Sequence, residues 1–305
     1  MALRLSVATA AFVAVVAMNH LPARAQFGGG PPPYTPAPGA KDLKAVLYNW
    51  TWHMGMLRGV SEPEIVTTLE YQGKGTIQVD GQPCTLTKYR VSTNYQTPGQ
   101  RTQIECTRPN GQKYSNIEVV SADYAWNEDI PGAELVAGKG KATPLPATVQ
   151  ERLIRLWASP QGAPKAALAG AAGTKATDVG ENPGVLVDKA AAGKATTTLA
   201  WPVVTFPIPG VPGAMATATL DDGFLPTRVV VKQGSSTTEF TYGDYQDWNN
   251  PLNKIEALYA GTIVERRNGV VVRNLTTVQT ETGSVYVVVP VPASVRNAAT
   301  SKAGK

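Results

Sequence analysis

The residue types that most often carry catalysis are few in this chain. His53 is the single histidine beyond residue 25, and it lies between Trp52 and Met54 in "NWTWHMGMLRG". A Ser-His-Asp triad would have to use it, but the sequence contains no nucleophile elbow. One histidine and two cysteines that are expected to form a disulfide do not supply a zinc site, which needs about four ligands. We predict no catalytic residue, no metal ligand and no cofactor, and interpret His53 as a hydrogen-bonded structural residue.

Carboxylates form two clusters in the sequence, and both are more typical of turns than of catalytic or metal-binding sites. Asp221-Asp222-Gly223 is typical of a hairpin turn. Asp244 and Asp247, with Asn249 and Asn250, offer oxygen ligands for Ca²⁺, but their spacing does not match an EF-hand loop. A glycosidase would need two carboxylates facing each other across a cleft. The sequence neither shows nor excludes such a pair, so a carboxylate-dependent hydrolase stays open as an alternative.

The first 25 residues are typical of a secretory signal peptide. A short basic start is followed by the apolar run "LSVATAAFVAVVAM" and by the small-residue cleavage pattern "ARA" at residues 23–25. The run is shorter than the roughly 20 apolar residues of a transmembrane helix. We therefore predict cleavage after Ala25, a periplasmic or secreted mature chain, and no integral membrane span within it.

Cys84 and Cys106 are the only cysteines, and each lies in a strand-like run. In an oxidising compartment such a pair more often forms a disulfide than two free thiols. The Cys-x-x-Cys spacing of redox-active pairs is absent. We predict a structural disulfide between these two residues.

The charge pattern gives no sign of a nucleic-acid partner. The formal net charge of +5 falls to +3 when Arg4 and Arg24 leave with the signal peptide. The remaining lysines and arginines are spread along the chain, whereas nucleic-acid binding needs a basic stripe. We expect no nucleic-acid partner.

Helical spacing marks the start of the folded region. Residues 26–41 are rich in Pro and Gly and predict a flexible leader. Asp42 is a candidate N-cap and Gly59 a candidate stop. Between them, apolar residues recur at intervals of three and four and predict one helix: Leu43, Val46, Leu47, Trp50, Met54 and Leu57.

Strand-like alternation dominates the rest of the chain. Residues 64–127 predict an antiparallel meander with a hairpin turn at residues 109–111, and residues 144–169 predict two short helices. Residues 170–183 are expected to be a loose linker. The runs after it, including residues 284–292, predict further strands. The Pro-rich segment 202–213 is expected at the rim of a curved sheet or over a cavity.

These elements predict an α+β fold with a mainly antiparallel sheet. We expect a single β-rich domain at 42–297, with halves 42–169 and 184–297, and a disordered tail at 298–305. The order of elements resembles the periplasmic lipoprotein carriers of the Lol pathway and the related mycobacterial lipid-binding lipoproteins. The resemblance implies a large curved, half-barrel-like sheet on which the N-terminal helix and the middle helix pair are packed, with a lipid or other hydrophobic ligand between them.

The resemblance also implies a set of ligand-binding residues. Trp50, Met54 and Leu57 would pack into the sheet, while Trp52 and Met56 would line or gate a cavity. The full predicted set is Trp50, Trp52, Met54, Met56, Leu57, Trp126, Trp157 and Trp201. Ordinary core packing explains the same residues equally well. A non-catalytic envelope protein that binds another envelope protein is a further alternative.

Overall fold

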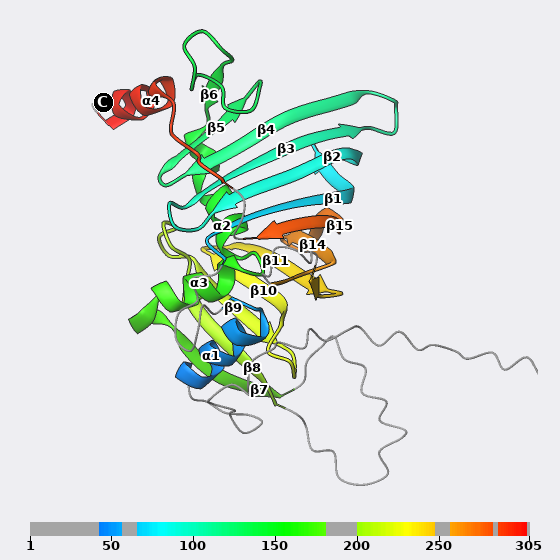
Figure 1. The fold of residues 1–305 in the computed structure, drawn as a ribbon, viewed down its shortest axis with the longest axis vertical. Coiled ribbons are helices and arrows are strands. Elements are labelled where there is room, and N and C mark those ends of the chain that lie inside the picture. The colour runs from blue at the N-terminus through cyan, green and yellow to red at the C-terminus, as the bar shows by residue number, and fades with distance from the viewer. Residues whose placement is uncertain (1–42, 57–65, 181–199, 248–256, 283–285, 304–305) are drawn as a thin grey trace, which may run out of the picture.

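One antiparallel sheet of 13 strands forms most of the protein (Figure 1). The computed structural model describes residues 43–56, 66–180, 200–247, 257–282 and 286–303. The predicted signal peptide and leader lie outside these residues. The α+β class and the large, curved, mainly antiparallel sheet are confirmed.

Two groups of strands, here called wings, make up the sheet. The first wing contains β1 (Thr68–Val79), β2 (Gln82–Asn94), β3 (Gly99–Thr107), β4 (Lys113–Ser121), β5 (Tyr124–Glu128) and β6 (Ala142–Pro144). The second contains β7 (Lys175–Gly180), β8 (Ala200–Pro207), β9 (Met215–Leu220), β10 (Pro226–Gln233), β11 (Ser236–Gly243), β14 (Thr262–Arg267) and β15 (Val270–Thr282). β1 pairs with β15 and joins the wings, which leaves β6 and β7 as the edges of an open sheet. A separate small ribbon pairs β12 (Gln246–Asp247) with β13 (Leu258–Tyr259).

The sheet is strongly curved, as one contact across it demonstrates. Arg273 on β15 and Glu118 on β4 are separated by three intervening strands. In a flat sheet their backbones would lie about 19 Å apart, at about 4.8 Å per strand. Their side chains instead approach to 3.6 Å. The face on which they meet is therefore concave and is called the inner face below.

Three helices cover the inner face, and a fourth lies beside β5 and β6 (Figure 1). The inner helices are α1 (Leu43–His53), α2 (Val149–Trp157) and α3 (Gly162–Ala169), and the fourth is α4 (Ala293–Ala303). The main core lies between the inner helices and the sheet. A smaller apolar cluster forms on the outer face, under the segment that leads to α4: Ile117, Val119, Trp126, Ala142, Val287, Val289 and Val295. Among the described residues, no helix is both long and apolar enough to cross a membrane.

Helix α1 ends earlier than the sequence predicts. The amide of Met56 donates to Thr51 O and the amide of Gly55 donates to Trp52 O, both at 2.9 Å. This pattern is a Schellman motif, and it requires Gly55 in the left-handed region, where its φ is 68°. The helix therefore stops at Gly55. The predicted stop at Gly59 was wrong in position, and residue 59 itself lies outside the described residues.

The predicted meander, middle helix pair and disulfide are confirmed. Cys84 on β2 and Cys106 on β3 are bonded, with Cα atoms 5.6 Å apart. Strand β1 runs without a break through Gly73 and Gly75, where its register shifts against its neighbours. A Cβ atom at Gly75 would lie 2.1 Å from the backbone oxygen of Asn274, so only glycine fits this close approach.

Three segments differ from the sequence-based expectation. Residues 175–180 form the edge strand β7 where a loose linker was expected, because their backbone pairs with β8. Residues 286–292 belong to no strand, although Val287 and Val289 alternate with exposed neighbours and pack on the outer face. Residues 298–303 continue helix α4 where a disordered tail was expected.

Candidate functional site

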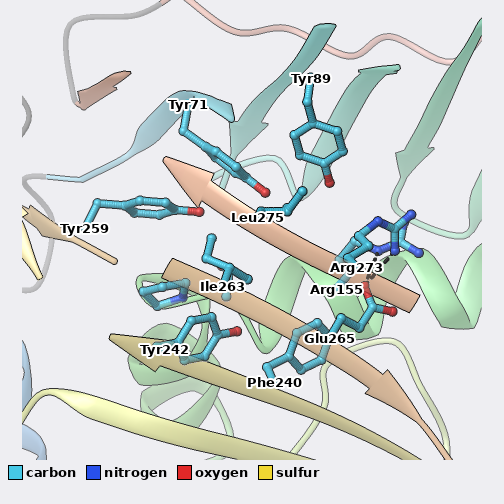
Figure 2. Close-up of a pocket in the computed structure, with 12 residues that line it drawn as sticks. Tyr71, Tyr89, Arg155, Phe240, Tyr242, Tyr259, Ile263, Glu265, Arg273 and Leu275 are labelled. Carbon is cyan, nitrogen blue, oxygen red and sulfur yellow. Dashed lines mark hydrogen bonds and ion pairs between the residues drawn. The ribbon is translucent and has the colours of Figure 1, made fainter. Parts of the chain in front are cut away.

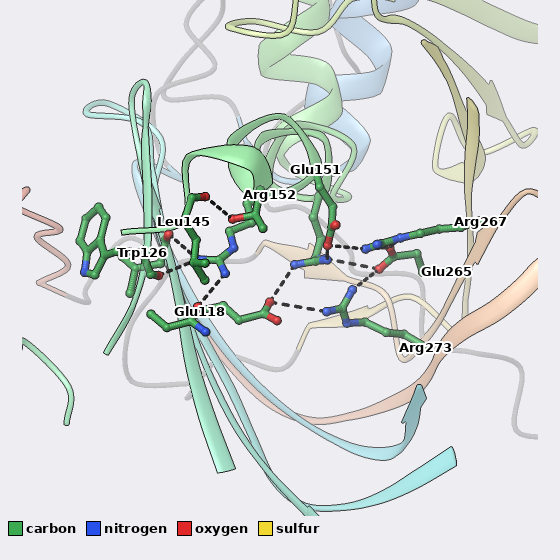
Figure 3. Close-up of polar contacts among 12 residues, drawn as sticks. Glu118, Trp126, Leu145, Glu151, Arg152, Glu265, Arg267 and Arg273 are labelled. Carbon is green, nitrogen blue, oxygen red and sulfur yellow. Dashed lines mark hydrogen bonds and ion pairs between the residues drawn. The ribbon is translucent and has the colours of Figure 1, made fainter. Parts of the chain in front are cut away.

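A buried ion network lies at the centre of the inner face (Figure 3). Helix α2 carries Arg155 into it, and this guanidinium contacts three carboxylates. It lies 3.1 Å from Glu118 on β4, 2.7 Å from Glu151 on α2 and 3.4 Å from Glu265 on β14. Arg155 thus connects α2 to both wings of the sheet.

Glu265 is the most enclosed carboxylate of the network. Its oxygens accept hydrogen bonds from Arg273 Nη1 at 2.6 Å and from Arg267 Nη2 at 2.9 Å. Arg267 also donates to Glu151 at 2.7 Å. Since the side chain of Glu265 is only 2% exposed, these arginines replace the water that a carboxylate would otherwise bind.

The arginines hold all three glutamates in the charged form. Burial alone would raise the pKa of Glu265, but Arg273, Arg155 and Arg267 outweigh burial and lower it. Burial likewise opposes ionisation of Glu118, whose pKa is lowered by Arg155 and Arg273. Burial also opposes ionisation of Glu151, but Arg155 and Arg267 outweigh burial and lower its pKa to about 2. A general acid in glycoside hydrolysis needs a raised pKa, so these carboxylates do not fit that role.

Arg152, one turn before Arg155, fastens α2 to the first wing. Its Nη1 donates to the backbone oxygens of Val119 at 2.8 Å and Trp126 at 2.6 Å. Its Nη2 donates to Asn127 Oδ1 at 2.7 Å. Arg152 therefore binds neutral oxygens and fixes the position of α2 over β4 and β5.

A pocket of about 20 Å³ opens beside the ion network (Figure 2). This volume accommodates one water molecule, which needs about 10–15 Å³, but no acyl chain. Both wings and the connection between α2 and α3 contribute to its wall: Tyr71, Tyr89, Arg155, Ser159, Pro160, Phe240, Tyr242, Tyr259, Ile263, Glu265, Arg273 and Leu275. The pocket thus has a charged end at Arg155, Glu265 and Arg273, and an aromatic and aliphatic remainder.

Two polar atoms at the charged end lack a partner. The hydroxyl of Tyr89 and Nε of Arg273 are buried and make no hydrogen bond within the described part of the chain. Tyr89 is 2% exposed and Arg273 is 8% exposed. Figure 2 shows the Tyr89 hydroxyl directed toward Arg273. Buried donors of this kind are uncommon in folded proteins and invite an explanation.

Side-chain hydrogen bonds hold the α2–α3 turn, residues 158–161, against the sheet. The hydroxyl of Tyr242 donates to Ala158 O at 2.7 Å. The hydroxyl of Tyr95 lies 3.1 Å from Ser159 Oγ. The Gln161 amide donates to Leu258 O. Because Ser159 and Pro160 line the pocket, this turn forms its cover.

The predicted ligand-binding residues do not line this pocket. Trp50, Met54 and Met56 are fully buried in the main core, where Trp50 packs against Phe206 with ring centroids 6.3 Å apart. Trp52 is partly exposed and stacks on Tyr48. Whether these residues also contact a ligand stays a prediction.

The remaining predicted residues are dispersed. Trp157 packs against Tyr95 with ring centroids 6.3 Å apart, just before the α2–α3 turn. Trp126 points to the outer face, away from Arg152 (Figure 3), so the structure does not bring it together with the tryptophans of the inner face. Trp201 lies in β8, and its side chain is outside the described residues, as is Leu57.

Sequence reasoning missed the ion network. Glu265 shares a face with the apolar Ile263, and Arg273 shares one with Leu275, so both charges occupy inward positions of apolar strands. A charged residue on the apolar face of a strand indicates a buried ion pair, and this signal is present in the sequence. Glu265 and Arg273 are also direct cross-strand partners, but a register shift at Glu265/Arg266 produces that pairing. A regular hairpin around Asn268-Gly269 would place Val272 there.

Comparisons with known proteins give weak likenesses only. No family model and no curated protein match the chain. Among solved structures, it is similar to a domain described as an outer membrane lipoprotein-sorting protein from Vibrio parahaemolyticus, with 10% identity, a TM-score of 0.39, and coverage of 72% of this chain and 87% of that one. It is also similar to the Mycobacterium tuberculosis lipoprotein LppX, with 12% identity, a TM-score of 0.22, and coverage of 63% and 90%. Likenesses this weak carry no argument about function.

Proposed function

We propose that this protein binds a lipid or another hydrophobic small molecule between the curved sheet and its inner helices. The observation that carries the proposal is the pocket on the inner face, where aromatic and aliphatic side chains of both wings meet beneath the α2–α3 turn. Ligand sites are typically concave and mostly apolar, with a few convergent polar groups. The aromatic walls and the charged end of this pocket fit that description.

The pocket is too small for an acyl chain in this structure, so ligand uptake requires movement. Its cover is the α2–α3 turn, which joins helices of nine and eight residues. Separation of this turn from the sheet would break the hydrogen bonds of Tyr95, Tyr242 and Gln161 and would extend the pocket between helix and sheet. The ligand would then take the place of these contacts.

The proposal describes a binding protein that performs no chemistry. The carboxylates beside the pocket are each paired with arginines and have lowered pKa values, which suits a fixed scaffold and not proton transfer. The Cys84–Cys106 disulfide fits an oxidising compartment. Together with the predicted signal peptide, it supports a periplasmic or secreted location.

Mass spectrometry of organic extracts is the direct test. The protein is purified folded from the periplasm, and the extract is analysed for a lipid near one copy per chain. In parallel, uptake of the hydrophobic dye 1-N-phenylnaphthylamine is measured by fluorescence, with circular dichroism confirming that the protein stays folded. Extractable ligand and dye uptake support the proposal, whereas an empty extract and no uptake by the folded protein overturn it.

A pair of variants locates the site. Ile263→Trp places a large side chain in the pocket, which is lined by Ile263, and should abolish dye uptake. Val278→Trp adds the same side chain at a position of β15 that is 47% exposed and should leave uptake unchanged. Equal uptake by both folded variants would place the ligand elsewhere.

A further inference from the structure

We infer that the ligand is an amphiphile with a carboxylate head group that is held at the charged end of the pocket by Tyr89 and Arg273. This inference rests on the proposed function, because it specifies the chemistry of the molecule bound there. It starts from the two unpartnered polar atoms, the Tyr89 hydroxyl and Arg273 Nε.

Arg273 Nε is a hydrogen-bond donor, and the Tyr89 hydroxyl can act as one. An arginine has no acceptor atoms, so Nε can only donate. The tyrosine hydroxyl is directed toward the same guanidinium and can donate its proton to a shared partner (Figure 2). A single acceptor placed between them would satisfy both groups. A carboxylate or phosphate oxygen is the acceptor that gains most, since hydrogen bonds to ionised groups are roughly twice as strong as neutral ones.

The charge of the surroundings also favours an anion. Two arginines and one glutamate line the charged end: Arg155, Arg273 and Glu265. The groups behind them are Arg152, Arg267, Glu118 and Glu151. Arg267 and Glu151 are partly exposed and balance each other, so the three arginines and two glutamates of the interior leave one excess positive charge. Buried charge is stable only when compensated, and a monovalent anion would supply the missing negative charge.

The apolar lining of the pocket away from its charged end indicates that the anion carries an apolar chain. Phe240, Ile263 and Leu275 line the pocket away from the charged end. The tyrosine rings extend this surface, with the centroids of Tyr71 and Tyr259 5.0 Å apart. A free inorganic anion would leave this apolar wall without a partner, whereas an alkyl or aryl chain would cover it.

The test compares two ligands that differ only at the head. Binding of dodecanoate and of dodecanol to the folded, delipidated protein is measured by isothermal titration calorimetry below their micellar concentrations. We expect dodecanoate to bind at least about tenfold more tightly than dodecanol, as one charge-assisted hydrogen bond implies. Sodium acetate and inorganic phosphate, tested alone, should bind far more weakly than dodecanoate.

Tyr89→Phe removes the unpartnered hydroxyl and nothing else. Without ligand, the variant should be at least as stable as the wild type, because it loses a buried unsatisfied group. Its preference for dodecanoate over dodecanol should fall by about tenfold, while dodecanol binding stays within about twofold. Tyr114→Phe, on β4 and outside the pocket lining, is the matched control and should keep the full preference.

The outcomes separate the head-group inference from the proposed function. Equal binding of acid and alcohol to the wild type overturns the acidic head group and leaves hydrophobic binding intact. Phosphate or acetate binding as tightly as dodecanoate shows a site for a free anion and overturns the amphiphile. No binding of either dodecyl compound overturns both statements.

Discussion

Glu265 shows how a charge is tolerated in the interior of this protein. Its carboxylate is buried, yet Arg155, Arg267 and Arg273 surround it and supply the hydrogen bonds that water would otherwise provide. Such pairs add little net stability compared with apolar packing. Loss of one partner, however, strongly lowers the free energy of unfolding, because the other charges stay buried. The network should therefore be sensitive to substitution of any single member.

Glu265→Gln should lower the free energy of unfolding by about 3–5 kcal/mol, because Arg155 and Arg273 would remain buried with too little negative charge. Denaturant unfolding followed by tryptophan fluorescence measures this loss. Glu105→Gln is the matched control, since Glu105 forms a solvent-exposed pair with Lys88 at 3.3 Å. The control should change stability by no more than about 1 kcal/mol. Similar losses in both variants would contradict the structural importance of the network.

Stability should decline in acid, and Glu151 should account for part of the decline. Its pKa of about 2 in the folded protein lies below the ordinary 4.5, so the unfolded chain binds more protons between these values. The stability that this carboxylate contributes is complete above pH 4.5 and is lost as the pH falls toward 2. Unfolding free energies of the wild type and Glu151→Gln, measured from pH 7 down to pH 3, should converge as the pH falls. Parallel curves would refute this assignment.

At the scale of elements, we expect the α2–α3 turn to control access to the pocket. Tyr242→Phe removes the hydroxyl that donates to Ala158 O and leaves this oxygen buried without that donor. We expect a loss of about 1–3 kcal/mol in stability and severalfold faster uptake of 1-N-phenylnaphthylamine in stopped-flow fluorescence. Ile117→Val, in the outer-face cluster, serves as the control, with a loss of about 1 kcal/mol and unchanged uptake kinetics. Equal acceleration in both variants would mean that general loosening, and not this turn, admits the dye.

The elements differ in how well sequence alone could predict them. The meander and the middle helix pair were predictable because their apolar residues follow the strand and helix periods and are separated by turn residues. Residues 286–292 show the limit of this approach. Val287 and Val289 alternate with exposed neighbours because the chain is extended, but their backbone pairs with no strand and Asn94 instead donates to Val287 O at 2.8 Å. Alternation reveals extended backbone and does not reveal its hydrogen-bond partner.

The site was less predictable than the fold. The pocket forms where β1 and β2 meet β11, β14 and β15, and a one-residue register shift sets Glu265 opposite Arg273. Tryptophan and methionine are conspicuous in the sequence, yet Trp50, Met54 and Met56 are in the core, as large apolar side chains usually are. Most residues that line the pocket are tyrosines and charged groups whose proximity depends on long-range pairing.

At the scale of the whole molecule, the two wings should unfold together. They share one continuous sheet through the β1–β15 pair, and Arg155 contacts glutamates of both wings. Leu275→Ala on β15, at 2% exposure, should cost about 2–5 kcal/mol. In hydrogen exchange under mild denaturant, amides of β3 and of β10 should then be released to the same extent. Faster exchange in one wing alone would show that the wings are separate folding units.

The β1–β15 pair also sets the order in which the chain can fold after synthesis. Gln72 on β1 lies beside Gln279 on β15, 207 residues later. Until the ribosome has released β15, the first wing has an unpaired edge at β1 and the second has one at β14. Exposed edges of this kind recruit strands from other chains. A nascent chain of this topology is therefore most vulnerable to aggregation just before its last strand is complete, and a chaperone that shields β1 during translation would protect it most.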